Sequence, residues 1–233
     1  MQKIRLWDLP TRLFHWLLAA AVLALFVTGE VGGNAIEWHG KIGLFALGLI
    51  AFRLVWGFVG PTYARFAQFF PSPGRIRAYL HGEWRGLGHN PLGALSVFAL
   101  LGLVGLQAVL GLFANDDIAF RGPLYELAGS ELSSRLTGMH QLLSKVILAL
   151  VALHVGAILF YAHVKKDNLV KPMITGWKEA DKRELGEQGE SAQGGGPLAL
   201  ILALALAGLA LWGAAGSWMP APPPPAAVQT PAW

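Results

Sequence analysis

The 233-residue chain contains no cysteine, and charged residues make up only 14% of it. The lack of cysteine excludes disulfides, iron–sulfur clusters, thiolate metal sites and covalently attached c-type haem in this chain. Charged residues make up about 25% of an ordinary soluble domain. Hydrophobic residues reach 54% of the sequence and cluster in long runs, which favours an integral membrane protein.

Five apolar runs are each close to the roughly 20 residues that a helix needs to cross a bilayer. They cover residues 13–29, 37–59, 92–113, 137–161 and 197–218. The basic flank before the first run is also typical of a signal peptide. That run, however, contains His15 and lacks a small-x-small cleavage site, so we expect a retained helix. Asn90 and Pro91 are suited to be the N-cap and the first-turn proline of the third helix.

Basic residues gather on one side of the predicted spans. They occupy the N-terminal flank and the connections 60–91 and 162–196, whereas the other side holds only Lys41, Arg121 and Arg135. The basic set is Lys3, Arg5, Arg12, Arg65, Arg75, Arg77, Arg85, Lys165, Lys166, Lys171, Lys178, Lys182 and Arg183. The positive-inside rule therefore predicts a cytoplasmic N-terminus, and an odd number of spans places the C-terminus outside.

Four of the seven histidines fall at two matched depths. His140 and His154 are 14 residues apart. This spacing is about 21 Å of helical rise and about 40° short of four turns, so both face the same side of the fourth helix. With the predicted orientation, His15 lies at the inner level with His154, and His39 lies at the outer level with His140.

Each pair brings imidazoles from two helices to one depth. Six-coordinate haem iron needs two axial ligands on opposite faces of a flat ring, and facing helices can supply them. We therefore predict two haems whose iron ligands are His15, His154, His39 and His140. Hydrogen bonding within the bundle is an alternative for any one buried histidine. Zinc is another alternative, although two histidines without carboxylates or thiolates match structural zinc poorly.

Several cationic side chains are candidate partners for the haem propionates, because arginine pairs well with carboxylates. Lys41 or Arg135 could bind propionates at the outer level. Arg53 follows His39 by 14 residues and shares its face at the inner level, and Arg12 is a second inner candidate. Lys145 lies between the two levels, about 140° round the helix from His140, and is a candidate proton or propionate partner. Snorkelling to the membrane interface explains Arg12 and Arg53 equally well.

The remaining three histidines are expected outside the haem sites. His81 and His89 lie in an inner connection rich in aromatic residues, where we expect them to be solvated. His163 follows the last turns of the fourth span beside Lys165 and Lys166, which favours a position at the interface.

The predicted fold is all-α: a four-helix transmembrane bundle that binds two haems, with a fifth C-terminal transmembrane helix. Residues 1–176 would form the di-haem domain, and 177–196 a polar cytoplasmic linker. Residues 197–218 would form the extra helix, followed by a Pro-rich outer tail at 219–233. The fifth helix has no ionisable residue, so we expect it to be an appendage to the four-helix core.

Several segments resemble the bacterial cytochrome b561 family in order. They are WDLPTRLFHW, WHGKIG, FRLVWGFVGPTYARF, GHNPLGALSV, GLFAND and the stretch from GMHQLLSKVILALVALHV to VKPMITG. This family includes the membrane cytochrome b subunit of nickel–iron hydrogenases. The resemblance covers about residues 3–176 and implies two b-type haems, one held from the first and fourth helices and one from the second and fourth. It carries these ligand roles to the four histidines named above.

The resemblance also implies a function in the bacterial inner membrane. We expect electron transfer between the membrane quinone pool and a periplasmic partner, either a c-type cytochrome or a hydrogenase or dehydrogenase subunit. Acidic residues on the outer side would suit a basic cytochrome, namely Asp116, Asp117, Glu126 and Glu131. The chain would thus be an electron-transfer subunit in contact with membrane lipid and without a nucleic-acid partner.

Two other functions stay open at this point. The first is a superoxide-to-quinone oxidoreductase that acts without a protein partner, with Lys41, Arg135 and Lys145 attracting the anion. The second is a proton-coupled transporter with histidine relays, although the sequence shows no inverted repeat.

Overall fold

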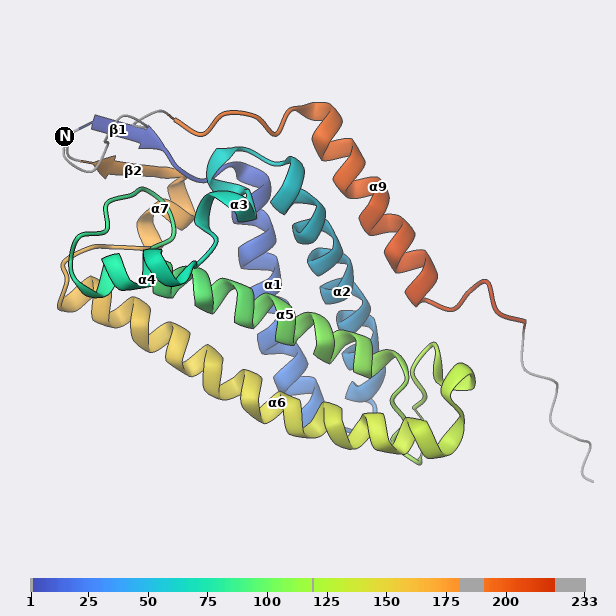
Figure 1. Cartoon of the computed structure of the whole chain (residues 1–233). Helices are drawn as coiled ribbons and strands as arrows, with labels where there is room; N and C mark the ends of the chain where they lie inside the picture. Colours follow the sequence, from blue (N-terminus) through green and yellow to red (C-terminus); the bar gives the residue numbers. More distant parts are fainter. Residues whose placement is uncertain (1, 119, 181–190, 221–233) are drawn as a thin grey trace, which may run out of the picture.

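The computed structural model describes residues 2–118, 120–180 and 191–220, which form a bundle of long helices with a small sheet at one end (Figure 1). The long helices are α1 (Leu9–Val31), α2 (Ala35–Val59), α5 (Pro91–Leu112), α6 (Tyr125–His163) and α9 (Pro197–Ala214). The short elements are β1 (Gln2–Arg5), the 3-10 turn η1 (Thr62–Ala64), α3 (Phe66–Phe69), α4 (Pro73–Leu80), α7 (Val170–Thr175) and β2 (Trp177–Ala180).

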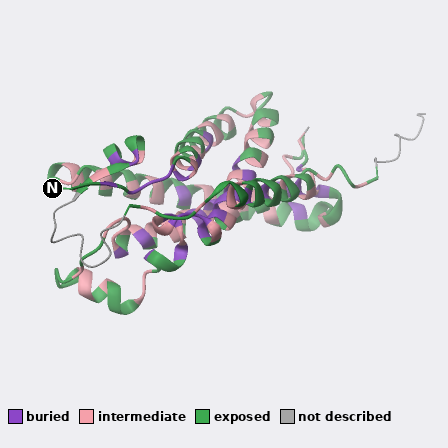
Figure 2. Cartoon of the chain, turned by 90° about the horizontal axis from the view of Figure 1, so that it is seen from above, coloured by how far each residue is buried: buried purple, intermediate pink, exposed green. Residues whose placement is uncertain are grey.

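Within the described residues, these five long helices have the length and composition to cross a membrane. Each contains the core of one predicted run, so the predicted helical membrane fold with five spans is confirmed. Large apolar side chains such as Leu23, Phe58 and Leu198 are exposed on the outer faces of the helices, and burial is concentrated between the helices (Figure 2). A hydrocarbon surround is the environment that such outer faces require.

The longest helix, α6, bends near its start. Gly129 has a φ of 70°, a left-handed conformation that glycine adopts without a steric penalty. The helix that carries His140 and His154 therefore runs without interruption from the residues after Gly129 to His163. The fourth predicted span, at 137–161, lies inside this segment.

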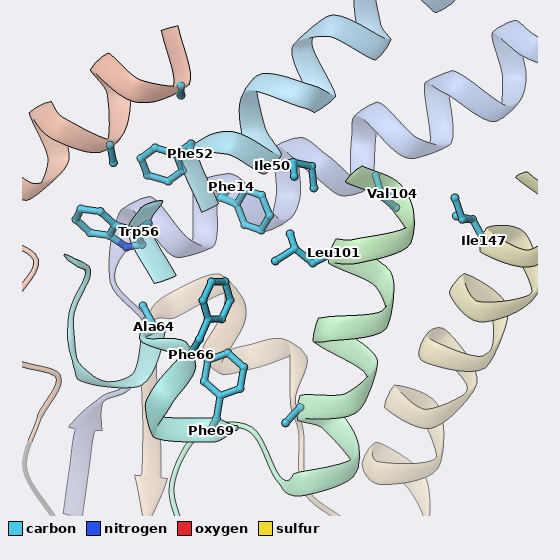
Figure 3. Packing of buried hydrophobic residues seen from close by; sticks show 13 residues of the cluster. Phe14, Ile50, Phe52, Trp56, Ala64, Phe66, Phe69, Leu101, Val104 and Ile147 are labelled. Carbon is cyan, nitrogen blue, oxygen red and sulfur yellow. The ribbon is translucent and has the colours of Figure 1, made fainter. Parts of the chain in front are cut away.

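The core lies where α1, α2 and α5 meet. Phe14, Ile50 and Leu101 pack there with Trp56 and Phe66, and Val104 and Ile147 extend the same cluster toward α6 (Figure 3). The close helix pairs are α1 with α2, α2 with α5, α5 with α6, and α9 with α2. In contrast, α6 is not closely packed on α1 or on α2, although it carries the histidines expected to face both of them.

The fifth span, α9, packs along α2 on the side away from α6 (Figure 1). Its small residues Ala203 and Ala207 are buried against the core, and a Cβ at Gly48 would lie 2.7 Å from the Leu211 side chain. Gly48 is nine residues after His39, which is about two and a half turns, so the two residues lie on opposite faces of α2. Helix α9 therefore contacts the face of α2 opposite His39.

The end of the bundle that holds β1, β2, α3, α4 and α7 carries most of the basic residues, and we call it the basic end (Figure 1). Strands β1 and β2 pair antiparallel, with Gln2 opposite Ala180 and Arg5 opposite Trp177. This sheet was not predicted, because two four-residue strands so far apart in sequence leave no local signal. The last residues before α9 also return to this end, where the Thr62 amide donates to the Gln193 carbonyl. Residues 181–190 of the predicted linker, and 221–233 of the predicted tail, lie outside the described residues.

Candidate haem sites

At the opposite end, which we call the acidic end, His39 of α2 and His140 of α6 lie against each other. Their ring centroids are 6.1 Å apart, with an angle of 74° between the ring planes. A metal ion bound between two opposed imidazoles, with metal–nitrogen bonds of about 2 Å, holds the ring centroids about 6 Å apart. The structure thus brings together the pair predicted at the outer level, at a separation suitable for shared ligation.

The Nδ1 atoms of both rings are already engaged. His39 Nδ1 lies 3.0 Å from the Leu25 carbonyl oxygen and 3.2 Å from Thr28 Oγ1, and His140 Nδ1 lies 3.0 Å from the Gln107 carbonyl oxygen. A backbone carbonyl only accepts hydrogen bonds, so each Nδ1 carries the proton and donates it. The Nε2 lone pair of each ring is consequently free to bind a metal, as in most protein sites with histidine ligands.

Gln107 holds His140 at two points. Its backbone carbonyl accepts the bond from the His140 ring, and its side-chain Nε2 donates to the His140 carbonyl oxygen at 3.0 Å. The Gln107 Oε1 atom is buried and has no hydrogen-bond partner among the described residues. The sequence analysis did not predict a role for Gln107. The signal that could have found it is a single amide side chain within the apolar run of α5.

His39 and His140 line a cavity of about 480 Å³ between α1, α2, α5 and α6. This volume falls within the range of about 300–1,000 Å³ that is typical of cofactor pockets. Four glycines widen the wall, namely Gly29, Gly40, Gly43 and Gly111. A Cβ at Gly29 would lie 3.3 Å from the His39 ring, and one at Gly111 would lie 3.2 Å from the His140 ring. The glycines thus leave space beside both imidazoles.

At the basic end, His15 of α1 and His154 of α6 are close enough for their charges to interact. The His154 Nδ1 lies 3.2 Å from Ser96 Oγ of α5, and the His15 Nδ1 is buried without a hydrogen-bond partner among the described residues. The pairing of His15 with His154 at one haem stays a prediction.

Three of the predicted cations, Arg12, Arg53 and Lys145, have different surroundings. Arg12 donates to the Ile174 carbonyl oxygen, and its Nε is buried without a partner among the described residues. Arg53 is only 3% exposed and lies at the basic end. Lys145 lines the cavity at the acidic end.

The prediction that His89 is solvated was wrong. Its ring packs between Trp7 and Phe69, with centroid distances of 4.7 and 4.6 Å. The connection that carries it folds back under the bundle through α3 and α4, so residues that look like a surface loop in the sequence cover the basic end of the core (Figure 1). His81, at the end of α4, is exposed as predicted.

The sequence pattern of the prokaryotic cytochrome b561 family matches residues 6–176, which contain all four paired histidines. The chain belongs to this family. A cytochrome b561 is a membrane-embedded electron-transfer protein of the b type, and its cofactor is haem b. The family assignment therefore agrees with the helical bundle and its paired imidazoles.

Curated relatives carry a more specific description. The chain is 26% identical to a "Probable Ni/Fe-hydrogenase B-type cytochrome subunit" of Azotobacter vinelandii, over 75% of this chain and 88% of the relative. It is 26% identical to a protein of the same description from Rhizobium leguminosarum bv. viciae, over 78% and 92%. It is 24% identical to the "Probable Ni/Fe-hydrogenase 1 B-type cytochrome subunit" of Escherichia coli K12, over 74% and 89%. No solved structure gives a significant match.

The residues of this cytochrome b561 fit a haem better than a bare metal ion. The described residues contain no group of three or more His, Asp or Glu side chains that could hold a metal, whereas zinc takes three or four protein ligands. A haem supplies four ligand atoms of its own and needs two axial imidazoles. The opposed rings, their free Nε2 atoms and the adjoining cavity meet this requirement at the acidic end.

Proposed function

We propose that this chain is a di-haem cytochrome that transfers electrons between a periplasmic redox partner and the membrane quinone pool. His39 and His140 would hold one haem b, and His15 and His154 the other. The observation that carries the proposal is the His39–His140 pair, whose ring centroids are 6.1 Å apart beside a cavity that both residues line, with both Nδ1 atoms bonded to carbonyls. Each bound haem would supply a reversible one-electron carrier at its depth in the membrane.

The chain's own groups set the properties of these sites. The Nδ1 contacts fix the orientation of His39 and His140 and raise the basicity of their Nε2 atoms, which strengthens ligation. Two protein ligands per iron leave no open coordination position, which suits electron transfer rather than chemistry on a bound substrate. The apolar core between the two ends, which includes Val104 and Ile147, excludes water from the space between the sites.

The charge distribution gives the proposed orientation. The basic end would face the cytoplasm by the positive-inside rule, which places the N-terminus inside and the end of α9 outside. The acidic end would then face the periplasm of a bacterial inner membrane. Arg121 pairs with Glu126, and Arg135 with Glu131, so those two acids are partly neutralised. A nickel–iron hydrogenase is the partner that the names of the relatives favour, and a c-type cytochrome or a dehydrogenase subunit is the alternative.

The cavity bears on the superoxide alternative. Among the described residues that line it, Lys145 is the only Lys or Arg, and Glu30 and Asp116 are both acidic. Two carboxylates against one ammonium group disfavour entry of a small anion. Lys145 is therefore proposed as a partner of a haem propionate or as a proton carrier, and direct oxidation of superoxide is the less favoured function.

The purified protein should contain two haems per chain. Because each iron has two histidine ligands, the dithionite-reduced protein should show a low-spin b-type spectrum. A soluble quinone such as decyl-ubiquinone should then oxidise both haems in full, without oxygen. A ratio of one haem per chain, or haem that oxygen oxidises but quinone does not, would contradict the proposal.

Removal of residues 197–233 should leave both haems in place. Helix α9 contacts the face of α2 opposite His39 and lines none of the cavity described above. Haem content and the reduced spectrum of the truncated chain should equal those of the full chain, although its thermal stability should fall because Ala203 and Ala207 lose their burial. Loss of one haem on truncation would show that α9 completes a binding site.

A further inference from the structure

His89 is a half-buried residue, with a buried Nδ1 atom, that the paired ligand sites do not use. It lies in the connection between α4 and α5, with Trp7 on one side and Phe69 on the other. Its Nδ1 atom is buried and has no hydrogen-bond partner among the described residues. A buried polar atom left without a partner destabilises the fold, so an acceptor or donor is expected beside it.

Arg53 also has a buried nitrogen without a hydrogen-bond partner among the described residues, and it lies near His89. Its Nη2 donates to the Ala64 carbonyl oxygen at 3.0 Å, and the guanidinium lies over the Phe66 ring at 4.5 Å. Its Nη1 is buried without a partner, and none of the ion pairs between described residues includes it. Arginine stays charged in proteins, so the buried guanidinium requires an anion.

The nearest candidate anion of the chain itself is already engaged. Asp8 lies close enough to Arg53 for their charges to interact, but its carboxylate accepts hydrogen bonds from Thr11 Oγ1 and from Trp56 Nε1 instead. It therefore offsets the Arg53 charge from a distance and does not satisfy either Arg53 Nη1 or His89 Nδ1. An oxygen anion from outside the chain would satisfy both.

The position of His89 and Arg53 indicates which anion they bind. The charge of His89 interacts with those of Arg53, His15 and His154, so His89 lies beside the second histidine pair. We propose that His89 is a positioning residue of the haem at the basic end, where its Nδ1–H and the Arg53 guanidinium together hold a propionate carboxylate. This role rests on the proposed function, because it requires a haem between His15 and His154.

The chemistry of His89 agrees with a donor role. Burial away from water, and then the neighbouring positive charge of Arg53, lower the pKa of His89 to about 3. The free ring is therefore neutral at physiological pH and carries one N–H. A neutral donor next to a fixed guanidinium matches a carboxylate, which accepts several hydrogen bonds and carries the compensating charge. A quinone carbonyl would satisfy His89 but leave the Arg53 charge without a counter-ion.

Two variants of the full-length protein separate hydrogen bonding from packing. His89→Phe keeps an aromatic ring between Trp7 and Phe69 but removes the donor, and His89→Gln keeps a donor but removes the ring. Loss of the donor leaves more negative charge on the propionate, which favours ferric iron. His89→Phe should therefore shift the ferric-to-ferrous equilibrium of the basic-end haem about threefold to tenfold toward the ferric form, which is about 28–59 mV in a redox titration. His89→Gln should keep a potential near that of the unmodified protein.

The outcomes distinguish this inference from the proposed function. Both variants should retain two low-spin haems, and the shift should appear only in the component that His15 or His154 variants disturb. If both haems are present but His89→Phe leaves their potentials unchanged, His89 does not hold a propionate and the inference fails alone. If His89→Phe only slows haem oxidation by decyl-ubiquinone, the residue serves a quinone instead. A high-spin haem in His89→Phe would make His89 an iron ligand and overturn both assignments.

Discussion

Replacing His39 or His140 with leucine should disturb one and the same haem, and replacing His15 or His154 should disturb the other. The ring centroids of His39 and His140 are 6.1 Å apart and both residues line the same cavity, so in the proposed site each would supply one axial ligand to the same iron. Loss of either ligand should convert that haem from low-spin to five-coordinate high-spin or release it, at the full amplitude of one haem per chain. The second component should keep its low-spin spectrum.

The readout should combine haem content, spin state and redox potential, because a buried haem with one remaining ligand can stay bound. His81 is exposed at the end of α4, and His81→Leu should keep both haems unchanged. The pairing would be wrong if His39 and His154 variants disturbed one spectral component and His15 and His140 variants the other. That result would require both α1 and α2, or α6 alone, to run in the opposite direction across the membrane.

Helical periodicity was sufficient to predict that His39 and His140 lie close together, whereas ligation of a haem by either histidine pair stays a prediction. A spacing of 14 residues fixes a face and a depth on any straight helix, and alternating spans then determine which histidines share a level. The structure brings His39 and His140 together as this argument predicted. The predicted ends of four spans lie within four residues of the observed helix ends, because long apolar runs are the strongest signal in a membrane protein sequence. The fourth span was predicted to start at 137, whereas α6 begins 12 residues earlier, at Tyr125.

Contacts between distant segments could not be predicted in the same way. The backbone carbonyls of Leu25 and Gln107 orient the rings of His39 and His140 through their Nδ1 atoms. Every residue has a backbone carbonyl, so the sequence does not indicate which ones make such contacts. His89 was predicted to be solvated because its neighbours looked like a surface loop, yet the burial of its ring depends on Trp7, more than 80 positions earlier. The local composition of a segment therefore does not predict which distant residues, such as Trp7, pack against it.

The glycine at position 111 gives a second test with a large expected effect. Gly111 lies on α5 against His140, and a Cβ there would approach the His140 Cε1 atom to 3.2 Å. This distance is tighter than ordinary van der Waals contact, and a leucine side chain would extend further into the cavity that Gly111 lines. The side chain and a haem would then compete for the same space, and cores this closely packed tolerate added volume poorly.

Gly111→Leu should therefore empty the acidic-end site, lowering haem content from two per chain to about one, with the remaining haem at the basic end still low-spin. Gly102→Leu is the matched control, because Gly102 lies on the same helix and a Cβ there meets no atom within 4 Å. That variant should keep two haems, which separates the effect of position from that of adding leucine to α5. Equal haem content in the two variants would mean that the cavity beside His140 is not where the haem binds, and that the role of His140 must be found elsewhere.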